Sequence, residues 1–198
     1  MDLNKNSYNQ IASDWAKSRN KSFLSELIID FTNKLKLNGN VLDIGCGTGY
    51  PIGAYLANRG FEITGIDFSE SMIQKAIELH LPKSQFFLTD FFDFVPTRLF
   101  DGIIAFDSFF HFPYASQRLI YPKVANWLQP GGVLLFTHGL KSSEINSDMF
   151  GQPFYYSSLD KDEVIQLLES NGMEIENSIE KYVEKDMDRD WVVFCRKK

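Results

Sequence analysis

The chain has 198 residues, of which 44% are hydrophobic and 15% aromatic, so it can bury a core of the size expected for one domain. Its 20 Lys and Arg against 26 Asp and Glu give a net charge of −6, which provides no broad attraction to nucleic-acid phosphates. Cys46 and Cys195 lie far apart, and no apolar run approaches the roughly 20 residues that span a bilayer. We therefore expect a cytoplasmic protein with free thiols and neither a membrane nor a nucleic acid as partner.

The N-terminal region, residues 1–38, is predicted to be helical. In the segment SFLSELIIDFTNKLKL, apolar residues recur at helical spacing from Phe23 to Leu35, and Gly39 just beyond them is a typical stop signal. This stripe predicts a helix that packs on the rest of the domain. The preceding segment, YNQIASDWAKSR, contains two aromatic residues, Tyr8 and Trp15.

From residue 40 onward, short strand-like runs alternate with amphipathic segments. The runs are rich in β-branched or aromatic residues; in chain order they are NVLDIG, FEITGID, QFFLTD, FDGIIAFD and GVLLFTH. Helix-like segments lie between them at residues 50–59, 69–80 and 116–128. This alternation predicts right-handed β-α-β units and a parallel sheet that is covered by helices on both faces.

The last third of the chain has a different pattern. Residues 139–158 show no clean period and mix polar with aromatic residues, which predicts a substrate-facing loop. Residues 159–198 predict a helix, with Ser158 as its N-cap and Gly172 as its stop, and then two paired strands. We expect one α/β domain: a doubly wound, mostly parallel sheet of seven strands that ends in an antiparallel hairpin, with its ligand-binding core at residues 39–138.

The stretch VLDIGCGTGY, residues 41–50, runs from a buried strand into a loop with glycine at every second position. Glycine can adopt positive φ and lets a ligand lie against the backbone, so the loop predicts a binding turn. A nucleoside triphosphate site would need a lysine directly after the glycines, and none is present. A dinucleotide site would have a further glycine at position 50, where this chain has Tyr50.

The remaining pattern resembles the class I S-adenosylmethionine-dependent methyltransferases. In that family a strand ending in an acidic residue leads into alternating glycines, as Asp43 does here. A second carboxylate, Asp67, follows 18 residues after Gly49, and Asp90 follows the third strand. The segments FDGIIAFDSFFHF and WLQPGGVLLFTH match the family's fourth and fifth strands, so the resemblance covers roughly residues 38–138. It implies a Rossmann-like fold, S-adenosyl-L-methionine as cofactor and S-adenosyl-L-homocysteine as product.

The chemistry of this cofactor suits such residues. It has a sulfonium, an ammonium, a carboxylate, a ribose and an adenine but no phosphate, so its site needs carboxylates and backbone donors more than lysines. The family pattern implies that Asp43 orients the amino-acid end, Asp67 binds the ribose hydroxyls and Asp90 accepts from the adenine amino group. The expected cofactor-binding residues are Asp43, Gly45, Cys46, Gly47, Gly49, Asp67, Phe68, Asp90, Phe91 and Asp107.

Several of these residues have a structural alternative. Asp67 is also placed to cap the helix that begins near Ser69. Asp90 follows a strand, where aspartate is an ordinary turn residue, and Asp93 is a nearby rival. Cys46 is best explained as a small buried filler, because methyl transfer requires no thiol.

The acceptor side is implied by the family's geometry, in which the methyl group points toward the end of the fourth strand. That end is DSFFHF here, so Asp107 and His111 are the candidate catalytic residues, and an imidazole can act as a general base. A lone histidine among aromatics is also a common structural residue. N-terminal helices and inserts after the fifth strand often cap this fold, which gives the candidate substrate-binding residues Tyr8, Trp15, His111, Tyr155 and Tyr156.

These patterns predict a methyltransferase that acts on a small-molecule acceptor. DSFF lacks the two prolines typical of enzymes that methylate amino groups of DNA bases and some proteins, and His111 and His138 form no recognisable metal-ligand cluster, so no metal is expected. One alternative is a non-catalytic S-adenosylmethionine-binding regulator or subunit. Another is a nicotinamide oxidoreductase, which Tyr50 disfavours.

Overall fold

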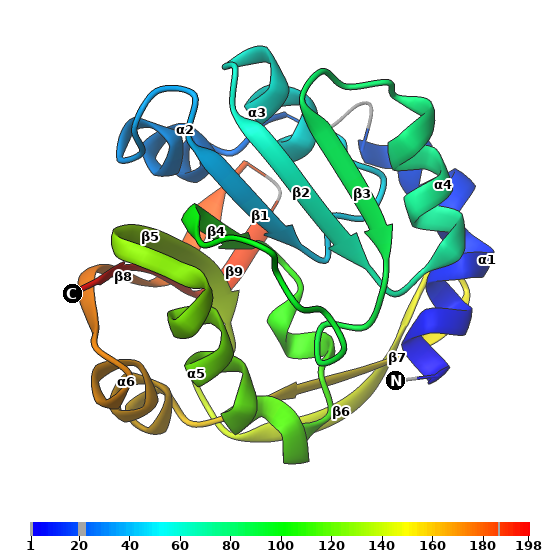
Figure 1. Cartoon of the computed structure of the whole chain (residues 1–198). Coiled ribbons are helices and arrows are strands. Elements are labelled where there is room, and N and C mark those ends of the chain that lie inside the picture. The colour runs from blue at the N-terminus through cyan, green and yellow to red at the C-terminus, as the bar shows by residue number, and fades with distance from the viewer. Residues whose placement is uncertain (1, 20–22, 186) are drawn as a thin grey trace.

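The computed structural model describes residues 2–19, 23–185 and 187–198. Its main feature is a twisted seven-stranded sheet with helices on both faces (Figure 1). The strand order is β3-β2-β1-β4-β5-β9-β8, in which β1 to β5 pair in parallel and β9 runs antiparallel to both β5 and β8. The strands are β1 (Asn40–Ile44), β2 (Glu62–Asp67), β3 (Ser84–Leu88), β4 (Phe100–Ala105), β5 (Leu128–His138), β8 (Met173–Glu184) and β9 (Met187–Lys197). The predicted fold class is confirmed.

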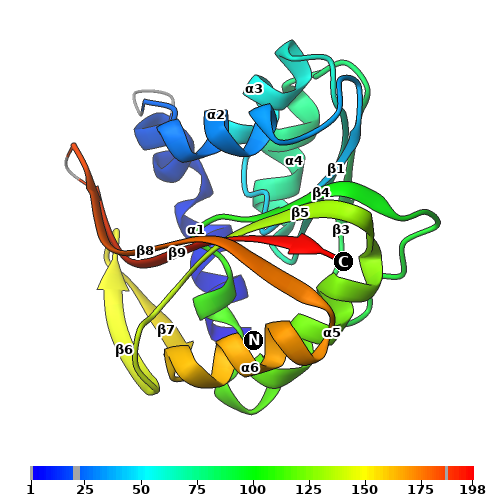
Figure 2. The same cartoon turned by 90° about the vertical axis from the view of Figure 1, so that its left-hand side faces the viewer.

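The central strands are apolar without interruption because both of their faces are covered. Val41 and Leu42 are neighbours in β1 and point to opposite faces, yet both are fully buried. Figure 2 shows α2 (Glu26–Asn33) and α3 (Ile52–Asn58) on one side of the sheet, and α5 (Gln117–Trp127) and α6 (Lys161–Ser170) on the other. The two hydrophobic clusters follow this division, since Val41 packs with the α2 side and Leu42 with the α5 side.

Two further helices complete the layers. α4 (Glu70–Glu78) packs against β2 and β3, and α1 (Asp2–Arg19) lies across α4 and the strand β7 (Gln152–Ser158) (Figure 1). Ser69 is the N-cap of α4, where its Oγ accepts the Met72 N–H at 3.3 Å. No helix within the described ranges is long and apolar enough to cross a membrane.

The predicted loop at residues 139–158 is wrong in form. It is mainly a β-hairpin of β6 (Ser143–Met149) and β7, which turns at Phe150 and Gly151, both with positive φ. Six of the seven residues of β6 are exposed, so the strand has no apolar face that could reveal a period of two. The hairpin is held by β7, whose Phe154 is fully buried against α1.

The start of α6 also differs from the sequence expectation. Ser158 remains in β7, where its hydroxyl donates to the Lys141 carbonyl at 2.6 Å, and the helix begins at Lys161 after Asp160. Because Ser158 pairs with Ser143 of β6, it does not act as the N-cap of α6.

Candidate active site

The candidate site lies at the carboxyl ends of β1, β2 and β4, where ligands of open α/β sheets commonly bind. An inner cavity there is lined by eight of the ten predicted cofactor-binding residues: Asp43, Gly45, Cys46, Gly47, Asp67, Phe68, Phe91 and Asp107. An outer cavity adjoins it and shares Tyr8, Trp15, Arg19, Asp107, His111 and Arg189. The structure thus brings the predicted cofactor and acceptor residues to one place.

The three glycines of the loop have different structural reasons. A Cβ on Gly45 would lie 2.6 Å from Cβ of Ser108, so the β1 and β4 loops require glycine there in order to meet. A Cβ on Gly49 would press on the side chains of Ala76, Leu79 and Phe86 at 3.3 Å, which assigns this glycine to helix packing. Gly47 has a φ of +52°, and a Cβ on it would have only Trp15 Nε1 nearby, at 3.8 Å. Only Gly47 therefore presents bare backbone to open space.

Replacing Gly45 with alanine is expected to cost more stability than the same change at Gly131. Both residues have positive φ, and nothing lies within 4 Å of a Cβ on Gly131. Gly131→Ala should therefore lower the free energy of unfolding only by the backbone strain that it introduces, about 1–2 kcal/mol. Gly45→Ala adds the overlap with Ser108, which should cost about 1–3 kcal/mol more. Urea unfolding measures both free energies of unfolding. Equal losses would contradict the close contact between the two loops.

Two buried carboxyl groups dominate the inner cavity. Burial raises the pKa of Asp43 to about 7 and that of Asp67 to about 6. The Asp67 carboxylate accepts the Gly47 N–H at 2.9 Å and the Ser69 N–H at 2.8 Å, so it holds the glycine loop against the start of α4. Ser69, and not Asp67, is the N-cap of α4. Asp67 therefore braces the glycine loop and also lines the inner cavity.

Three predicted residues lie elsewhere or are inert. Asp90 and Gly49 do not line the inner cavity, and the Asp90 carboxylate accepts the Phe92 N–H at 2.8 Å as part of a local turn. Its adenine role stays a prediction without a supporting contact. Cys46 is buried, and burial raises the pKa of its thiol, which fits a packing role.

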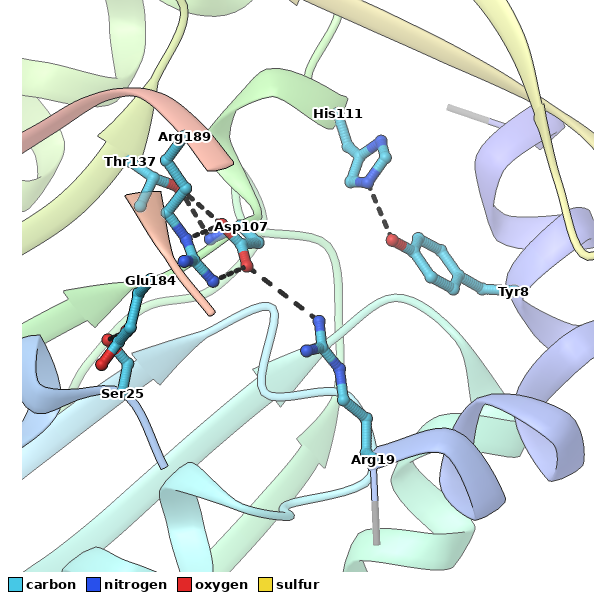
Figure 3. A network of polar contacts seen from close by, with 8 residues as sticks. All are labelled: Tyr8, Arg19, Ser25, Asp107, His111, Thr137, Glu184 and Arg189. Atoms are coloured by element: carbon cyan, nitrogen blue, oxygen red, sulfur yellow. Dashed lines mark hydrogen bonds and ion pairs between the residues drawn. The ribbon is translucent and has the colours of Figure 1, made fainter. Parts of the chain in front are cut away.

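Asp107 is at the centre of a partly buried ion-pair network at the junction of the two cavities (Figure 3). Arg189 donates from Nε to Oδ1 at 2.9 Å and from Nη2 to Oδ2 at 2.8 Å, and Arg19 approaches from the other side with Nη2 4.0 Å from Oδ2. Thr137 accepts the Asp107 N–H at 2.8 Å. Asp107 therefore holds two guanidinium groups at the junction of the cavities, and its catalytic role stays a prediction.

His111 belongs to a second network on the acceptor side. Its Nε2 is 2.8 Å from the Tyr8 hydroxyl (Figure 3), and its Nδ1 is 3.3 Å from the Tyr155 carbonyl. The Asn4 amide nitrogen donates to the same carbonyl at 2.8 Å and lies 3.2 Å from His111 Nδ1, so the neighbours of Nδ1 accommodate either neutral tautomer. Burial lowers the pKa of His111 to about 4 and raises that of Tyr8, so both side chains are neutral near pH 7.

The outer cavity has aromatic and aliphatic walls. It has a volume of about 560 Å³, within the range usual for small-molecule sites, and the β6–β7 hairpin contributes Tyr156, Ile145 and Met149 to its lining. Tyr155 lines neither cavity, because its hydroxyl donates to Glu144 at 2.5 Å near the protein surface. Its predicted substrate contact stays a prediction, whereas Tyr8, Trp15, His111 and Tyr156 all line the outer cavity.

Comparison with known proteins finds a methyltransferase domain within the chain. A family model described as a methyltransferase domain matches residues 41–132, a range that includes the glycine loop, Asp67 and His111. This match agrees with the resemblance to the class I S-adenosylmethionine-dependent methyltransferases. The chain is 36% identical over 104 residues to YqeM of Bacillus subtilis, named as a methyltransferase, covering 50% of this chain and 41% of YqeM. It is 30% identical over 133 residues to phosphoethanolamine N-methyltransferase 1 of Zea mays, covering 64% of this chain and 26% of that protein.

A solved structure extends this likeness to the whole methyltransferase fold. The 1,6-didemethyltoxoflavin-N1-methyltransferase of Burkholderia thailandensis superposes with a TM-score of 0.78 over 98% of this chain and 87% of that one, at 16% identity. At that identity the likeness shows the fold. The chain spans less than half the length of the two curated relatives above.

The residues of the inner cavity fit S-adenosylmethionine. The described lining contains the buried carboxyl groups of Asp43 and Asp67, which suit a ligand with a sulfonium and an ammonium. Its two arginines, Arg19 and Arg189, are paired with Asp107. Two buried hydroxyls of the lining, Thr48 Oγ1 and Ser108 Oγ, have no hydrogen-bond partner within the described ranges. Such groups need polar partners, which a nucleoside with an amino-acid tail can provide.

The sequence analysis missed both arginines of the candidate site. Arg189, Trp191 and Val193 are two residues apart along β9 and so point to the same face of the sheet. Trp191 and Val193 are fully buried on that face. Strand periodicity therefore places Arg189 on the inward face, and a buried arginine is rare without a partner. Arg19 ends α1 with no comparable signal, because its partner is distant in sequence.

Proposed function

We propose that this chain transfers a methyl group from S-adenosylmethionine to a small-molecule acceptor. The observation that carries the proposal is the junction of the cavities: an inner cavity with Asp43, Asp67 and the glycine loop opens onto an outer cavity that contains Tyr8 and His111. The size and apolar walls of the outer cavity favour a small acceptor over a polymer. The Burkholderia enzyme named above also acts on a small heterocycle by its name.

The inner-cavity residues would hold the cofactor. When bound, S-adenosylmethionine supplies an activated methyl group on its sulfonium. Asp67 would accept hydrogen bonds from the ribose hydroxyls, Phe68 and Phe91 would lie against the adenine, and Asp43 would attract the ammonium end. These residues mainly align the reacting groups and exclude water, which is the largest contribution a protein makes to an in-line displacement.

Tyr8 and His111 would move the acceptor's proton. In the tautomer with hydrogen on Nδ1, His111 donates to the Tyr155 carbonyl and its Nε2 accepts the Tyr8 hydroxyl hydrogen. The Tyr8 oxygen takes a proton from the acceptor while its own proton passes to His111 Nε2. The imidazole is neutral near pH 7, so its Nε2 lone pair is free to accept that proton, but burial, which lowers its pKa to about 4, makes it a weaker base than a solvated histidine.

The proposal is tested by incubating the protein with methyl-labelled S-adenosylmethionine and a fractionated metabolite extract. Label that moves to a small-molecule fraction, and that is lost when S-adenosylhomocysteine is added in excess, supports it. Persistent cofactor binding with no label in any fraction would favour the non-catalytic alternative. Preferential thermal stabilisation by NAD would overturn the cofactor assignment.

Cofactor affinity is expected to fall as the pH is lowered from 7.5 to 5.5. The cofactor carries net positive charge and favours ionised carboxylates, whereas burial holds the pKa of Asp43 at about 7 and of Asp67 at about 6. Affinity should drop by up to about tenfold per pH unit for each carboxyl group that must lose its proton. Isothermal titration calorimetry across this range measures the trend.

The cofactor-free protein should show the opposite trend. Both folded pKa values lie above the unfolded value of 3.8, so the folded state binds more protons between pH 4 and 7. The free energy of unfolding contributed by these groups therefore rises as the pH falls through that window. Asp43→Asn and Asp67→Asn should flatten both curves. A pH-independent affinity in the unsubstituted protein would show that neither carboxyl group meets the cofactor's charge.

A further inference from the structure

The ion-pair network at the junction of the cavities is not balanced in charge. Two guanidinium groups, those of Arg19 and Arg189, share the single carboxylate of Asp107. The exposed fractions of their side chains are only 19% and 6%, so water compensates the extra positive charge poorly. The network therefore carries one uncompensated positive charge between the cofactor and acceptor sides.

Arg189 also has an unused donor. Its Nε and Nη2 are taken by Asp107, its guanidinium lies 4.3 Å above the Phe106 ring, and its Nη1 is buried without a hydrogen-bond partner in the described part of the chain. A buried donor on a charged group costs free energy when it has no hydrogen-bond partner, so we expect a bound ligand to supply that partner. Arg189 lines both cavities, which places that partner in the space between them.

The other charged groups of the outer cavity do not supply the missing negative charge. Lys181 and Asp190 form an ion pair with each other, and Asp188 is exposed, where water screens it. Burial lowers the pKa of His111 and of His138 to about 4, so neither adds charge near pH 7. The extra positive charge of the network is left for a ligand.

We infer that the acceptor carries a carboxylate, which binds Arg189 at the junction of the two cavities. This inference rests on the proposed function, because it takes the outer cavity to be the acceptor site. A single extra positive charge matches a monoanion, and a carboxylate is a planar monoanion that can accept from the unused Nη1 of Arg189. The aromatic and aliphatic walls, among them Tyr8, Phe110 and Tyr156, suit an apolar body. The acceptor class is thus a compact aromatic or apolar carboxylic acid.

The test measures binding of a matched pair of probes, 4-hydroxybenzoate and 4-hydroxybenzamide, to the full chain with and without S-adenosylhomocysteine. The acid should bind about tenfold or more tightly than the amide, as expected for a charge-assisted hydrogen bond. Arg189→Gln should abolish this preference. Asp107→Asn removes the competing carboxylate and should strengthen binding of the acid, so the two variants shift the affinity in opposite directions.

Each other outcome overturns the inference. Equal binding of the two probes, or a preference that survives in folded Arg189→Gln, removes the carboxylate site. Loss of the preference in Arg19→Gln alone would assign the anion to Arg19. Tighter binding of phenyl phosphate than of 4-hydroxybenzoate would replace the carboxylate by a phosphate. If Arg189→Gln does not fold, weaker acid binding in Asp107→Asn is enough to overturn it.

Failure of the proposed function gives a different result. If the protein binds the acid through Arg189 but transfers no label, the methyltransferase proposal is refuted and the anion site is retained. A protein that binds S-adenosylhomocysteine and transfers label, yet shows no preference for the acid, would keep the activity and lose the anion site.

Discussion

Replacing Asp67 with alanine is expected to weaken binding of S-adenosylmethionine by about 1.5–3 kcal/mol, which is roughly 10- to 150-fold in affinity. The Asp67 carboxylate lines the inner cavity, and under the proposed ribose assignment its loss removes charge-assisted hydrogen bonds to the cofactor. It also frees the Gly47 N–H, which the carboxylate holds at 2.9 Å, so the loop loses its brace. Isothermal titration calorimetry with S-adenosylhomocysteine measures the change.

Asp90→Ala is the matched control for this prediction. Asp90 is a second aspartate at a strand end, but its carboxylate lies in a local turn and does not line the inner cavity. Its replacement should change the affinity by less than about threefold. An unchanged affinity in Asp67→Ala would refute the ribose assignment, and an equal loss in Asp90→Ala would restore the adenine role that the sequence suggested.

The core of the fold was predictable from sequence because both faces of the central strands are buried. A strand such as β1 then reads as an uninterrupted apolar run, and an aspartate or glycine marks the point where it leaves the sheet. The carboxyl ends of parallel strands meet at one edge, so Asp43, Asp67 and Asp107 could be grouped correctly without coordinates.

The acceptor side was predictable only in part, because it depends on contacts between segments that are distant in sequence. Asp107 and Arg189 meet because β9 pairs antiparallel with β5, in a register that sets Trp191 opposite His138. No local pattern encodes that register. The β6–β7 hairpin was missed for a related reason, since β6 is almost wholly exposed and has no face that burial could mark.

Anchoring of the β8–β9 turn belongs to the same class of feature. Glu184 accepts the Ser25 hydroxyl at 2.5 Å and the Glu26 N–H at 2.9 Å, so the end of β8 is tied to the N-terminus of α2 (Figure 3). A carboxylate at a helix N-terminus is favourable for the helix dipole. The Ser25–Glu184 contact joins residues 159 positions apart.

Replacing His111 with glutamine is expected to lower kcat by about 10²- to 10⁴-fold, the usual contribution of a positioned general base. Glutamine retains hydrogen-bonding capacity but cannot take a proton. Affinity for S-adenosylhomocysteine should stay within about threefold, because His111 acts on the acceptor side.

Tyr8→Phe should lower kcat as well, and the double variant should lose little more than either single one, since the two residues act as a unit. Tyr155→Phe is the matched control, because this tyrosine lines neither cavity.

The pH profile separates this role from a structural one. Burial holds the pKa of His111 at about 4, so the base form persists well below the ordinary value of 6.5. At saturating cofactor, kcat should therefore stay level from pH 8 down to about 5 and fall only near pH 4, while KM for the cofactor rises earlier through Asp43 and Asp67. A fall in kcat centred near pH 6.5 would mean that His111 is solvated during catalysis. An unchanged kcat in His111→Gln would leave Tyr8 and His111 as a packing contact, and the acceptor would then need no base from this chain.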